Sequence, residues 1–437
     1  MKMKEPSILR EFTRYTSLNV IAMISVSCYI LADTFFIAMA LGTDGLAALN
    51  FAIPIFSFII GGGLMLGIGG ATRYSILKGQ NDADKANRAY TNTIFLMAGF
   101  SAFFFAAGLF FPNAITRILG TDETVFEMTK IYLQLLLLFA PVFIAQQVFL
   151  CFIRNDGSPQ LAMISTVAGS FLNILLDYLL IIMLDMGMFG AALATGFSQI
   201  GSLLILATFF LQKKNSFRFA RPALSRPLTA DILKTGAPSL IAELSIGIVI
   251  IVFNIIILSL QGSVGVAAYA IIANILVVVI AIYTGLAQGI QPLLSKNYGS
   301  GNIENVKKVL RYALIAVAGI SGAVYLFIFF GATQIVNIFN SEQNAVLQSL
   351  AENGLRLYFT ACIFAGFNII MPIYFTSTER TRPAHIISIL RGFILLVPMV
   401  FLLSALAGIT GTWLAFPATE LAVSLVCIAF FLYGKAD

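Results

Sequence analysis

The feature that most constrains the fold is a series of charge-free apolar segments, each long enough to cross a lipid bilayer. The longest extends from Leu244 to Ser295 and contains 52 residues. A helix rises about 1.5 Å per residue and the hydrocarbon core is about 30 Å thick, so about 20 residues make one crossing. This segment therefore predicts two spans, which separate at residues 261–265 (Gln-Gly-Ser-Val-Gly).

Segments of this kind recur along the whole chain and predict about twelve transmembrane helices. Hydrophobic residues make up 59% of the chain and charged residues 11%, which excludes a soluble globular protein. A transmembrane barrel would need many segments of about ten residues with alternating polarity, and the sequence does not have them. The expected fold class is an all-α polytopic membrane protein. The expected helix centres lie near residues 28, 60, 102, 140, 171, 200, 250, 280, 321, 362, 394 and 422.

Lysine and arginine cluster in every second connection between the predicted helices. Only Arg117, Lys130 and Arg356 fall on one side of the membrane, which leaves 23 of the 26 basic residues on the other. The positive-inside rule then predicts that both termini are cytoplasmic. The net charge of +6 reflects this topology, so we expect no nucleic-acid partner.

The chain repeats itself with a period of about 220 residues. A shift of 220 superposes residues 42–48 on residues 262–268 and brings four glycines into register. Shifts of 221 and 224 pair Gly190 with Gly411 and Pro159 with Pro383. We therefore expect two parallel six-helix bundles related by a pseudo-two-fold axis along the membrane normal. The expected units are 1–212, a flexible basic linker at 213–235, and 236–437.

Two carboxylates, Asp33 and Asp177, stand inside apolar segments, where an aspartate at the centre of a helix costs roughly 2.5 to 3.5 kcal/mol. The repeat places Phe253 opposite Asp33 and Phe416 opposite Thr195, so only the first half carries the polar groups. A purely structural role would be needed in both halves. The two carboxylates therefore indicate a functional site.

Asn173 and Asp177 are four residues apart and share one helix face. Thr195 can approach them from the next helix, where small residues permit close packing. With Asp33 they form an all-oxygen shell, which suits sodium. The same pair could instead bind protons, because desolvation and a neighbouring negative charge both favour the protonated acid. The alternative interpretation is that these residues are polar contacts that hold helices together.

Other polar residues are weaker candidates. Glu243 lines a substrate cavity or lies at the cytoplasmic interface, and Glu420 is a second protonatable site or the structural partner of Arg391. We find no metal-binding or nucleotide-binding motif and no catalytic triad, so we expect no enzyme activity and no cofactor. Besides Glu243, the expected cavity lining consists of Tyr29, Gln146, Gln147, Gln199 and Asn254.

The chain resembles the multidrug and toxic compound extrusion (MATE) family over its whole length. The resemblance rests on the order and duplication of short motifs. The motifs are Asp33-Thr-Phe-Phe, residues 42–48, Arg154-Asn-Asp-Gly-Ser-Pro159, Asn173-Ile-Leu-Leu-Asp177, Gly187-Met-Phe-Gly190 with its echo Gly408-Ile-Thr-Gly411, and Ala267-Ala-Tyr269.

The resemblance, to the prokaryotic DinF-like and MepA-like branch, implies an antiporter of the cytoplasmic (inner) membrane. It would act as a monomer among membrane lipids and export small amphipathic, often cationic compounds in exchange for sodium ions or protons. Asp33, Asn173, Asp177 and Thr195 would form its cation site. The first helix lacks the proline at which some members bend, so that bending mechanism is not expected to carry over. The alternatives are a lipid-linked saccharide flippase and a non-transporting receptor or channel.

Overall fold

The computed structural model describes residues 7–220, 225–340 and 343–433, which contain helices and no strands. Four basic residues of the charge count, Lys2, Lys4, Arg221 and Lys435, lie outside the described residues. The helices are α1 (Ile8–Gly79), α2 (Ala83–Phe110), α3 (Pro112–Ile118), α4 (Glu123–Leu138), α5 (Ala140–Asn155), α6 (Pro159–Asp177), η1 (Tyr178–Met183), α7 (Gly187–Leu211), α8 (Arg226–Gly299), α9 (Ile303–Phe339), α10 (Ala345–Tyr358), η2 (Phe359–Ala361), α11 (Cys362–Ser377), α12 (Thr381–Ile389), η3 (Leu390–Ile394) and α13 (Leu396–Tyr433).

Three of these helices are interrupted, and the interruptions confirm the predicted spans. Gly42 breaks α1 with φ 61° and ψ −146°, and Gly262 breaks α8 with φ 63° and ψ −156°. Gly408 breaks α13 at φ 56°. A positive φ strains residues that carry a Cβ, so glycine is favoured at such a break. The described residues contain eight helices of membrane length, or nine with the bent pair of α4 and α5 as one span, and dividing three of them at these breaks gives twelve.

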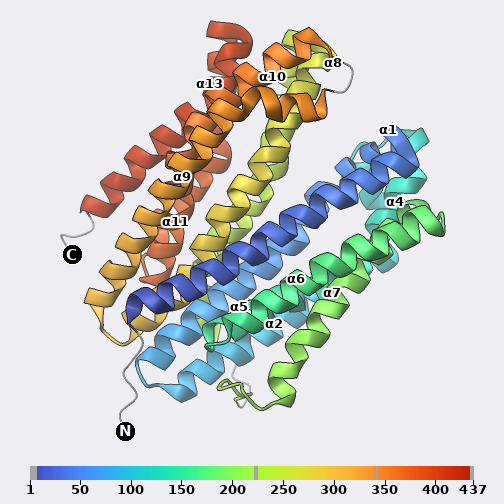
Figure 1. Cartoon of the computed structure of the whole chain (residues 1–437). Helices are drawn as coiled ribbons and strands as arrows, with labels where there is room; N and C mark the ends of the chain where they lie inside the picture. The colour runs from blue at the N-terminus through green and yellow to red at the C-terminus, as the bar shows by residue number, and fades with distance from the viewer. Residues whose placement is uncertain (1–6, 221–224, 341–342, 434–437) are drawn as a thin grey trace.

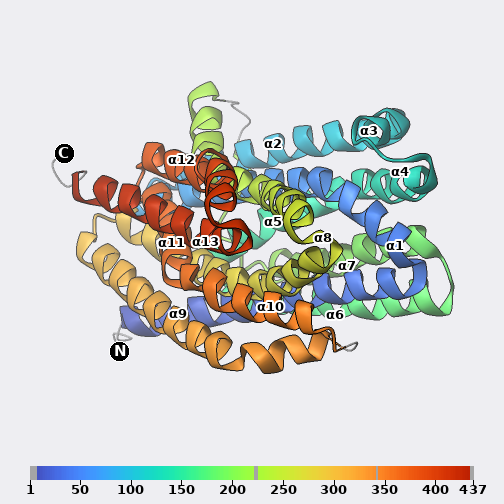
Figure 2. The same cartoon turned by 90° about the horizontal axis from the view of Figure 1, so that it is seen from above.

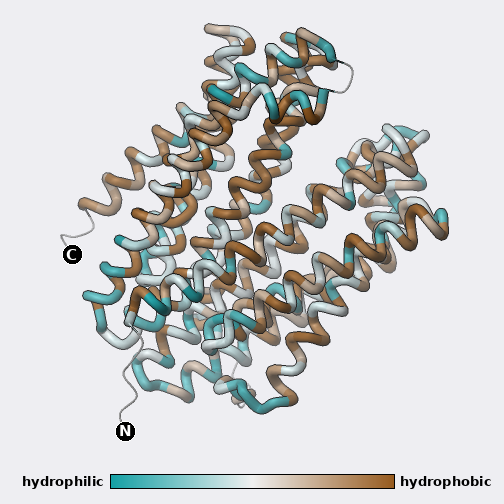
Figure 3. The backbone as a smooth tube through the Cα atoms, in the orientation of Figure 1, coloured by the Kyte–Doolittle hydropathy of each residue, from teal (hydrophilic) through white to brown (hydrophobic). Residues whose placement is uncertain are grey.

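The helices gather into two bundles with separate hydrophobic cores. We call α1–α7 the amino bundle and α8–α13 the carboxy bundle. Figure 1 shows the bundles side by side near the two termini and diverging toward the opposite end, and Figure 2 shows the same pair from above. The helix shafts are largely apolar, whereas hydrophilic residues gather at the end that holds the termini (Figure 3). We call this the basic end, because Arg73, Lys78 and Lys296 lie there.

Backbone contacts hold the bundles together at the basic end. A Cβ on Gly236 of α8 would lie 1.8 Å from the Met65 carbonyl oxygen of α1, and one on Gly69 would lie 2.1 Å from the Ile232 carbonyl oxygen. The two helices therefore touch where neither has a side chain in the way. α1 and α8 are the longest helices of the described residues, and their glycines form the contact between the two bundles.

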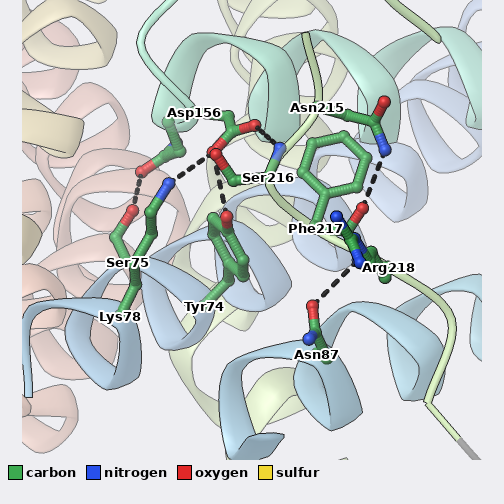
Figure 4. Close-up of polar contacts among 10 residues, drawn as sticks. Tyr74, Ser75, Lys78, Asn87, Asp156, Asn215, Ser216, Phe217 and Arg218 are labelled. Carbon is green, nitrogen blue, oxygen red and sulfur yellow. Dashed lines mark hydrogen bonds and ion pairs between the residues drawn. The ribbon is translucent and has the colours of Figure 1, made fainter. Parts of the chain in front are cut away.

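The predicted linker differs from the structure in two ways. Residues 226–235 already belong to α8, because Pro227 is acceptable in the first turn of a helix. Residues 215–220 are held against the amino bundle instead of forming a flexible strap. Their anchor is Asp156, which accepts hydrogen bonds from the Tyr74 hydroxyl (2.9 Å), the Lys78 ammonium (2.6 Å) and the Ser216 amide (2.6 Å), as Figure 4 shows.

Phe217 completes this attachment. Its side chain is 1% exposed and packs among Tyr74, Tyr90, Phe152 and Phe209. The Arg218 amide next to it donates to Asn87 Oδ1 at 2.8 Å (Figure 4). An aromatic side chain buried to this extent removes a large apolar area from water, so this part of the linker is fixed to the amino bundle.

Candidate cation site

Three helices of the amino bundle position the predicted cation-site residues. α1 supplies Asp33, α6 supplies Asn173 and Asp177, and α7 supplies Thr195. All four side chains are buried, and Asp177 and Asn173 have no exposed surface. The close approach of α6 and α7 depends on Gly169, because a Cβ there would lie 3.2 Å from Ser202 Cβ.

The two carboxylates lie close enough to interact electrostatically. Both oxygens of Asp177, one oxygen of Asp33, and the amide oxygen and nitrogen of Asn173 are buried and have no hydrogen-bond partner in the described residues. A buried polar group normally has a partner, and an unpaired one is costly. These oxygens fit a monovalent cation, whose ligands are oxygens, or protons that neutralise the carboxylates.

The site also contains a residue that the sequence did not reveal. Tyr132 of α4 is 5% exposed, interacts electrostatically with Asp33 and Asp177, and hydrogen-bonds Thr195. The Thr195 hydroxyl also donates to the Ala191 carbonyl of its own helix at 3.1 Å. One tyrosine among the leucines of α4 breaks no sequence pattern, so no signal in the sequence marked it as a site residue.

The structure separates the predicted cavity residues into three environments. Tyr29 lies beside the carboxylates, within electrostatic range of Asp33 and of Glu243 from the carboxy bundle. Gln147 packs against Gly63 of α1, where an added Cβ would lie 3.0 Å from the Gln147 Cβ. Asn254 lines an open cavity of about 310 Å³ with Ser263 and apolar residues of α8.

The other two predicted lining residues lie on helices of the amino bundle. Gln146 is 4% exposed and donates to Ser202 Oγ at 3.3 Å, inside the amino bundle between α5 and α7. Gln199 is partly buried on α7. Gln146 therefore belongs to the interior of the amino bundle in this arrangement.

The carboxy bundle has aromatic side chains at the corresponding positions. Phe253 and Phe416, the counterparts of Asp33 and Thr195, both contact Tyr358, at ring-centroid distances of 5.8 and 4.7 Å. Phe253 also stacks on Tyr269 at 5.1 Å, and Trp413 covers Tyr269. This bundle therefore holds an aromatic stack where the amino bundle holds carboxylates.

Glu420 has a complete set of structural partners, as one of its two predicted interpretations requires. Arg391 Nε lies 2.7 Å from one carboxylate oxygen, and Asn368 Nδ2 donates to the other at 2.7 Å. Ser424 in turn donates to Asn368 Oδ1 at 3.1 Å. The carboxylate is 1% exposed and is neutralised by the guanidinium, which explains how it is accommodated in an apolar bundle.

Polar side chains also join the two bundles at the basic end. Arg154 Nη1 donates to Asn19 Oδ1 at 2.7 Å and to Gln288 Oε1 of the carboxy bundle at 2.8 Å. Gln291 of α8 receives a 2.8 Å hydrogen bond from Asn155 and donates one of 2.8 Å to Thr72.

An outer pair of contacts lies beyond these hydrogen bonds. Arg73 of α1 pairs with Asp231 at 3.0 Å and with Glu379, both of the carboxy bundle. The basic end is therefore closed by hydrogen bonds and ion pairs in addition to the glycine contacts.

Among the residues that the structure describes, no group of three or more histidine, cysteine, aspartate or glutamate side chains comes together as a metal site. The cation site offers the carboxylates of Asp33 and Asp177, the amide of Asn173 and the hydroxyls of Thr195 and Tyr132. This donor set suits a weakly held monovalent ion better than a tightly bound transition metal, which prefers imidazole or thiolate ligands.

Comparison with known proteins supplies a family assignment. The family model described as MatE matches residues 19–179 and 238–402. Multidrug export protein MepA of Staphylococcus saprophyticus and that of Staphylococcus aureus are each 26% identical over 413 residues, which cover 93% of this chain and 90% of the relative.

Two solved structures are similar over almost the whole chain. A MATE structure in complex with MaL6 has a TM-score of 0.91 at 25% identity and covers 99% of this chain and 96% of its own. An outward-facing conformation of a multidrug resistance MATE family transporter of the MOP superfamily has a TM-score of 0.90 at 25% identity and covers 100% and 98%.

Proposed function

The chain belongs to the MatE family, and from this we propose that it is a secondary active multidrug exporter which exchanges its substrates for sodium ions or protons. Its substrates would be small amphipathic compounds, many of them cationic, and its role is transport without catalysis. The observation that carries the proposal is the set of unpartnered buried oxygens on Asp33, Asn173 and Asp177.

The cation site provides the coupling. A ligand shifts a conformational equilibrium only if it binds one conformation more tightly. Neutralising two neighbouring buried carboxylates changes the packing of α1 against α6, because their repulsion and desolvation cost are removed. Cation binding at Asp33 and Asp177 therefore favours one arrangement of the bundles, and substrate binding favours the other.

The contacts between the bundles suggest how access alternates. The bundles touch at the basic end and diverge toward the other (Figure 1). On the charge distribution of the sequence, we assign the basic end to the cytoplasm, which makes the described arrangement outward-open. Each inward positive charge then supplies about 2.3 kcal/mol per 100 mV of membrane potential.

A flippase for anionic lipid-linked saccharides is a weaker interpretation. Such a substrate needs unpaired cationic side chains in the cavity, but Arg391 is neutralised by Glu420 and Arg154 is bonded to Asn19 and Gln288 at the closed basic end. Glu243, which lies within electrostatic range of Tyr29 and against Gly61, places an acidic instead of a basic side chain between the bundles.

Dye efflux from proteoliposomes tests the proposal. The purified protein is reconstituted with the fluorescent cation ethidium inside, and sodium and pH gradients are imposed separately. We expect one of the two gradients to accelerate efflux above that of protein-free vesicles. Efflux that responds to neither gradient would contradict secondary active transport.

A further inference from the structure

A second set of buried oxygens lies inside the amino bundle, nearer the basic end than the carboxylates. Ser165 Oγ of α6 lies 2.6 Å from Ser202 Oγ of α7 and donates at 2.8 Å to the Ser202 carbonyl. Gln146 of α5 donates to Ser202 Oγ at 3.3 Å. The three side chains are between 0% and 4% exposed, so this cluster is removed from both water and lipid.

After the hydrogen bonds within the cluster are assigned, one side-chain oxygen remains without a partner in the described residues. Gln146 Oε1 is buried and has no partner in the described residues. An unpaired carbonyl oxygen at this depth is costly unless something else satisfies it. The two serine hydroxyls beside it can rotate to present lone pairs, so the cluster offers three neutral oxygens to a small cation.

Hydroxyl groups connect this cluster to the carboxylates. Thr195, Ser198 and Ser202 follow one another along α7 at intervals of three and four residues, which places them on one helix face. All three are buried, and Ser198 Oγ donates to the Thr195 carbonyl at 2.8 Å. From Thr195 to Ser202 the helix rises about 10 Å.

α6 provides a matching face. Asn173 of the cation site is followed toward the basic end by the buried hydroxyls of Ser170 and Ser165. Ser170 Oγ also lies 3.2 Å from Ser25 Oγ of α1. The face of α6 that carries Ser165, Gly169 and Asn173, at intervals of four residues, therefore runs beside α7, whereas Ser170 faces α1.

We propose that Ser165, Ser202 and Gln146 form a transit site for the coupling cation, sodium or hydronium, between the Asp33 and Asp177 site and the basic end. This rests on the proposed function. Neutral oxygens hold a cation more weakly than carboxylates do, and a transit site must bind weakly enough to release its ion. The coupling ion thus leaves through the interior of the amino bundle, apart from the space between the bundles that the substrate uses.

Arg154 determines when the ion can leave. It lies two helical turns beyond Gln146 on α5, is 5% exposed, and no acidic side chain of the described residues is its ion-pair partner. A buried positive charge repels a cation that approaches it. The charge of Arg154 therefore opposes the exit of the ion while the guanidinium is buried and bonded to Gln288, and it is screened by water once the bundles separate at the basic end.

The test compares gradient-driven efflux with substrate exchange, which needs no net ion movement. The double variant Ser165→Ala, Ser202→Ala is reconstituted as the full-length protein beside wild type and the control Thr166→Ala, whose hydroxyl bonds only its own helix. Efflux of ethidium is measured under a sodium gradient and under a pH gradient. Exchange of labelled for unlabelled ethidium is measured with no gradient.

We expect the double variant to slow gradient-driven efflux about tenfold, roughly 1.4 kcal/mol in the barrier, while its exchange rate and the control remain at wild-type levels. If the double variant slows only sodium-driven efflux, the coupling ion is sodium, and if it slows only pH-driven efflux, the coupling ion is the proton. Wild-type efflux in the double variant would overturn the transit site, and so would an equal fall in exchange, which would mark the serines as packing residues. A wild-type protein that responds to neither gradient would overturn the proposed function itself.

Discussion

The guanidinium of Arg154 donates a 2.8 Å hydrogen bond to Gln288 Oε1 and thereby links α5 of the amino bundle to α8 of the carboxy bundle. A hydrogen bond that involves a charged group contributes about 1.5 to 3 kcal/mol. This bond exists only while the basic end is closed. Its strength therefore contributes to how often that end opens, together with the Gln291 hydrogen bonds and the Arg73 ion pairs.

The variant Gln288→Ala should open the basic end more often. Cys151 lies beside Arg154, with its sulfur 3.7 Å from Nη2, and is 2% exposed. We expect N-ethylmaleimide to modify Cys151 about tenfold faster in the variant, as a loss of about 1.4 kcal/mol predicts. The exposed Cys28 is first replaced by alanine in both proteins. An unchanged labelling rate would show that the bond does not hold the basic end closed.

The variants Asp33→Asn and Asp177→Asn should abolish coupling without unfolding the protein. An amide cannot take up a proton in exchange or balance a sodium ion, so gradient-driven efflux should fall to that of protein-free vesicles. Asp185→Asn is the matched control, because Asp185 is an exposed carboxylate between η1 and α7. The thermal unfolding temperature in detergent should not fall in any of the three, and it should rise in the site variants because each removes an unpaired buried charge. Full transport by both site variants would contradict the assigned cation site.

Removing one partner of the Arg391 and Glu420 pair should destabilise the carboxy bundle. The change Glu420→Gln leaves the guanidinium without a counterion, and breaking a buried ion pair costs about 3 to 5 kcal/mol. We expect a lower unfolding temperature in detergent and a partial recovery in the double variant Arg391→Leu, Glu420→Leu. A Glu420→Gln variant that keeps its stability but loses coupling would favour the alternative interpretation of Glu420 as a second protonatable site.

The linker should depend on Phe217. Phenylalanine to alanine changes in well-packed cores cost about 3 to 5 kcal/mol, and Phe217 is 1% exposed. We expect Phe217→Ala to release residues 215–220 and to make the Lys213 and Lys214 peptide bonds susceptible to trypsin. Phe219→Ala is the control, because Phe219 is 69% exposed. Equal protease resistance in both variants would show that the ring does not fix the linker.

Hydropathy and internal repetition were sufficient to predict most of the fold. The break in α8 at Gly262 was predictable, because a 52-residue apolar segment cannot be one crossing and glycine is the residue that permits the turn. The attachment of residues 215–220 was not, because it depends on where Asp156 and a single phenylalanine meet in space. The basic residues around Phe217 predict a solvated segment, which concealed this attachment.

The site was predictable only in part for a related reason. Asp33 and Asp177 are conspicuous because charge is rare in apolar helices. Tyr132, Ser165 and Ser202 are compatible with any apolar helix, so their roles emerge only from the helices that surround them. The pairing of Arg391 with Glu420 was foreseen as one of two possibilities, since a buried charge needs a partner.

Under the proposed function, the aromatic stack of Phe253, Tyr358 and Phe416 limits how steep a substrate gradient the membrane potential alone can sustain. In the proposed exchange, the two carboxylates of the amino bundle alone take up charge, because the carboxy bundle holds aromatic side chains at the corresponding positions, so at most two charges would enter per cycle. At about 100 mV, two inward charges supply about 4.6 kcal/mol, which sustains roughly a 2000-fold gradient of a neutral compound. A monovalent cation carries one charge outward, which leaves about 2.3 kcal/mol and roughly a 50-fold gradient. The membrane potential therefore favours the removal of neutral over cationic compounds.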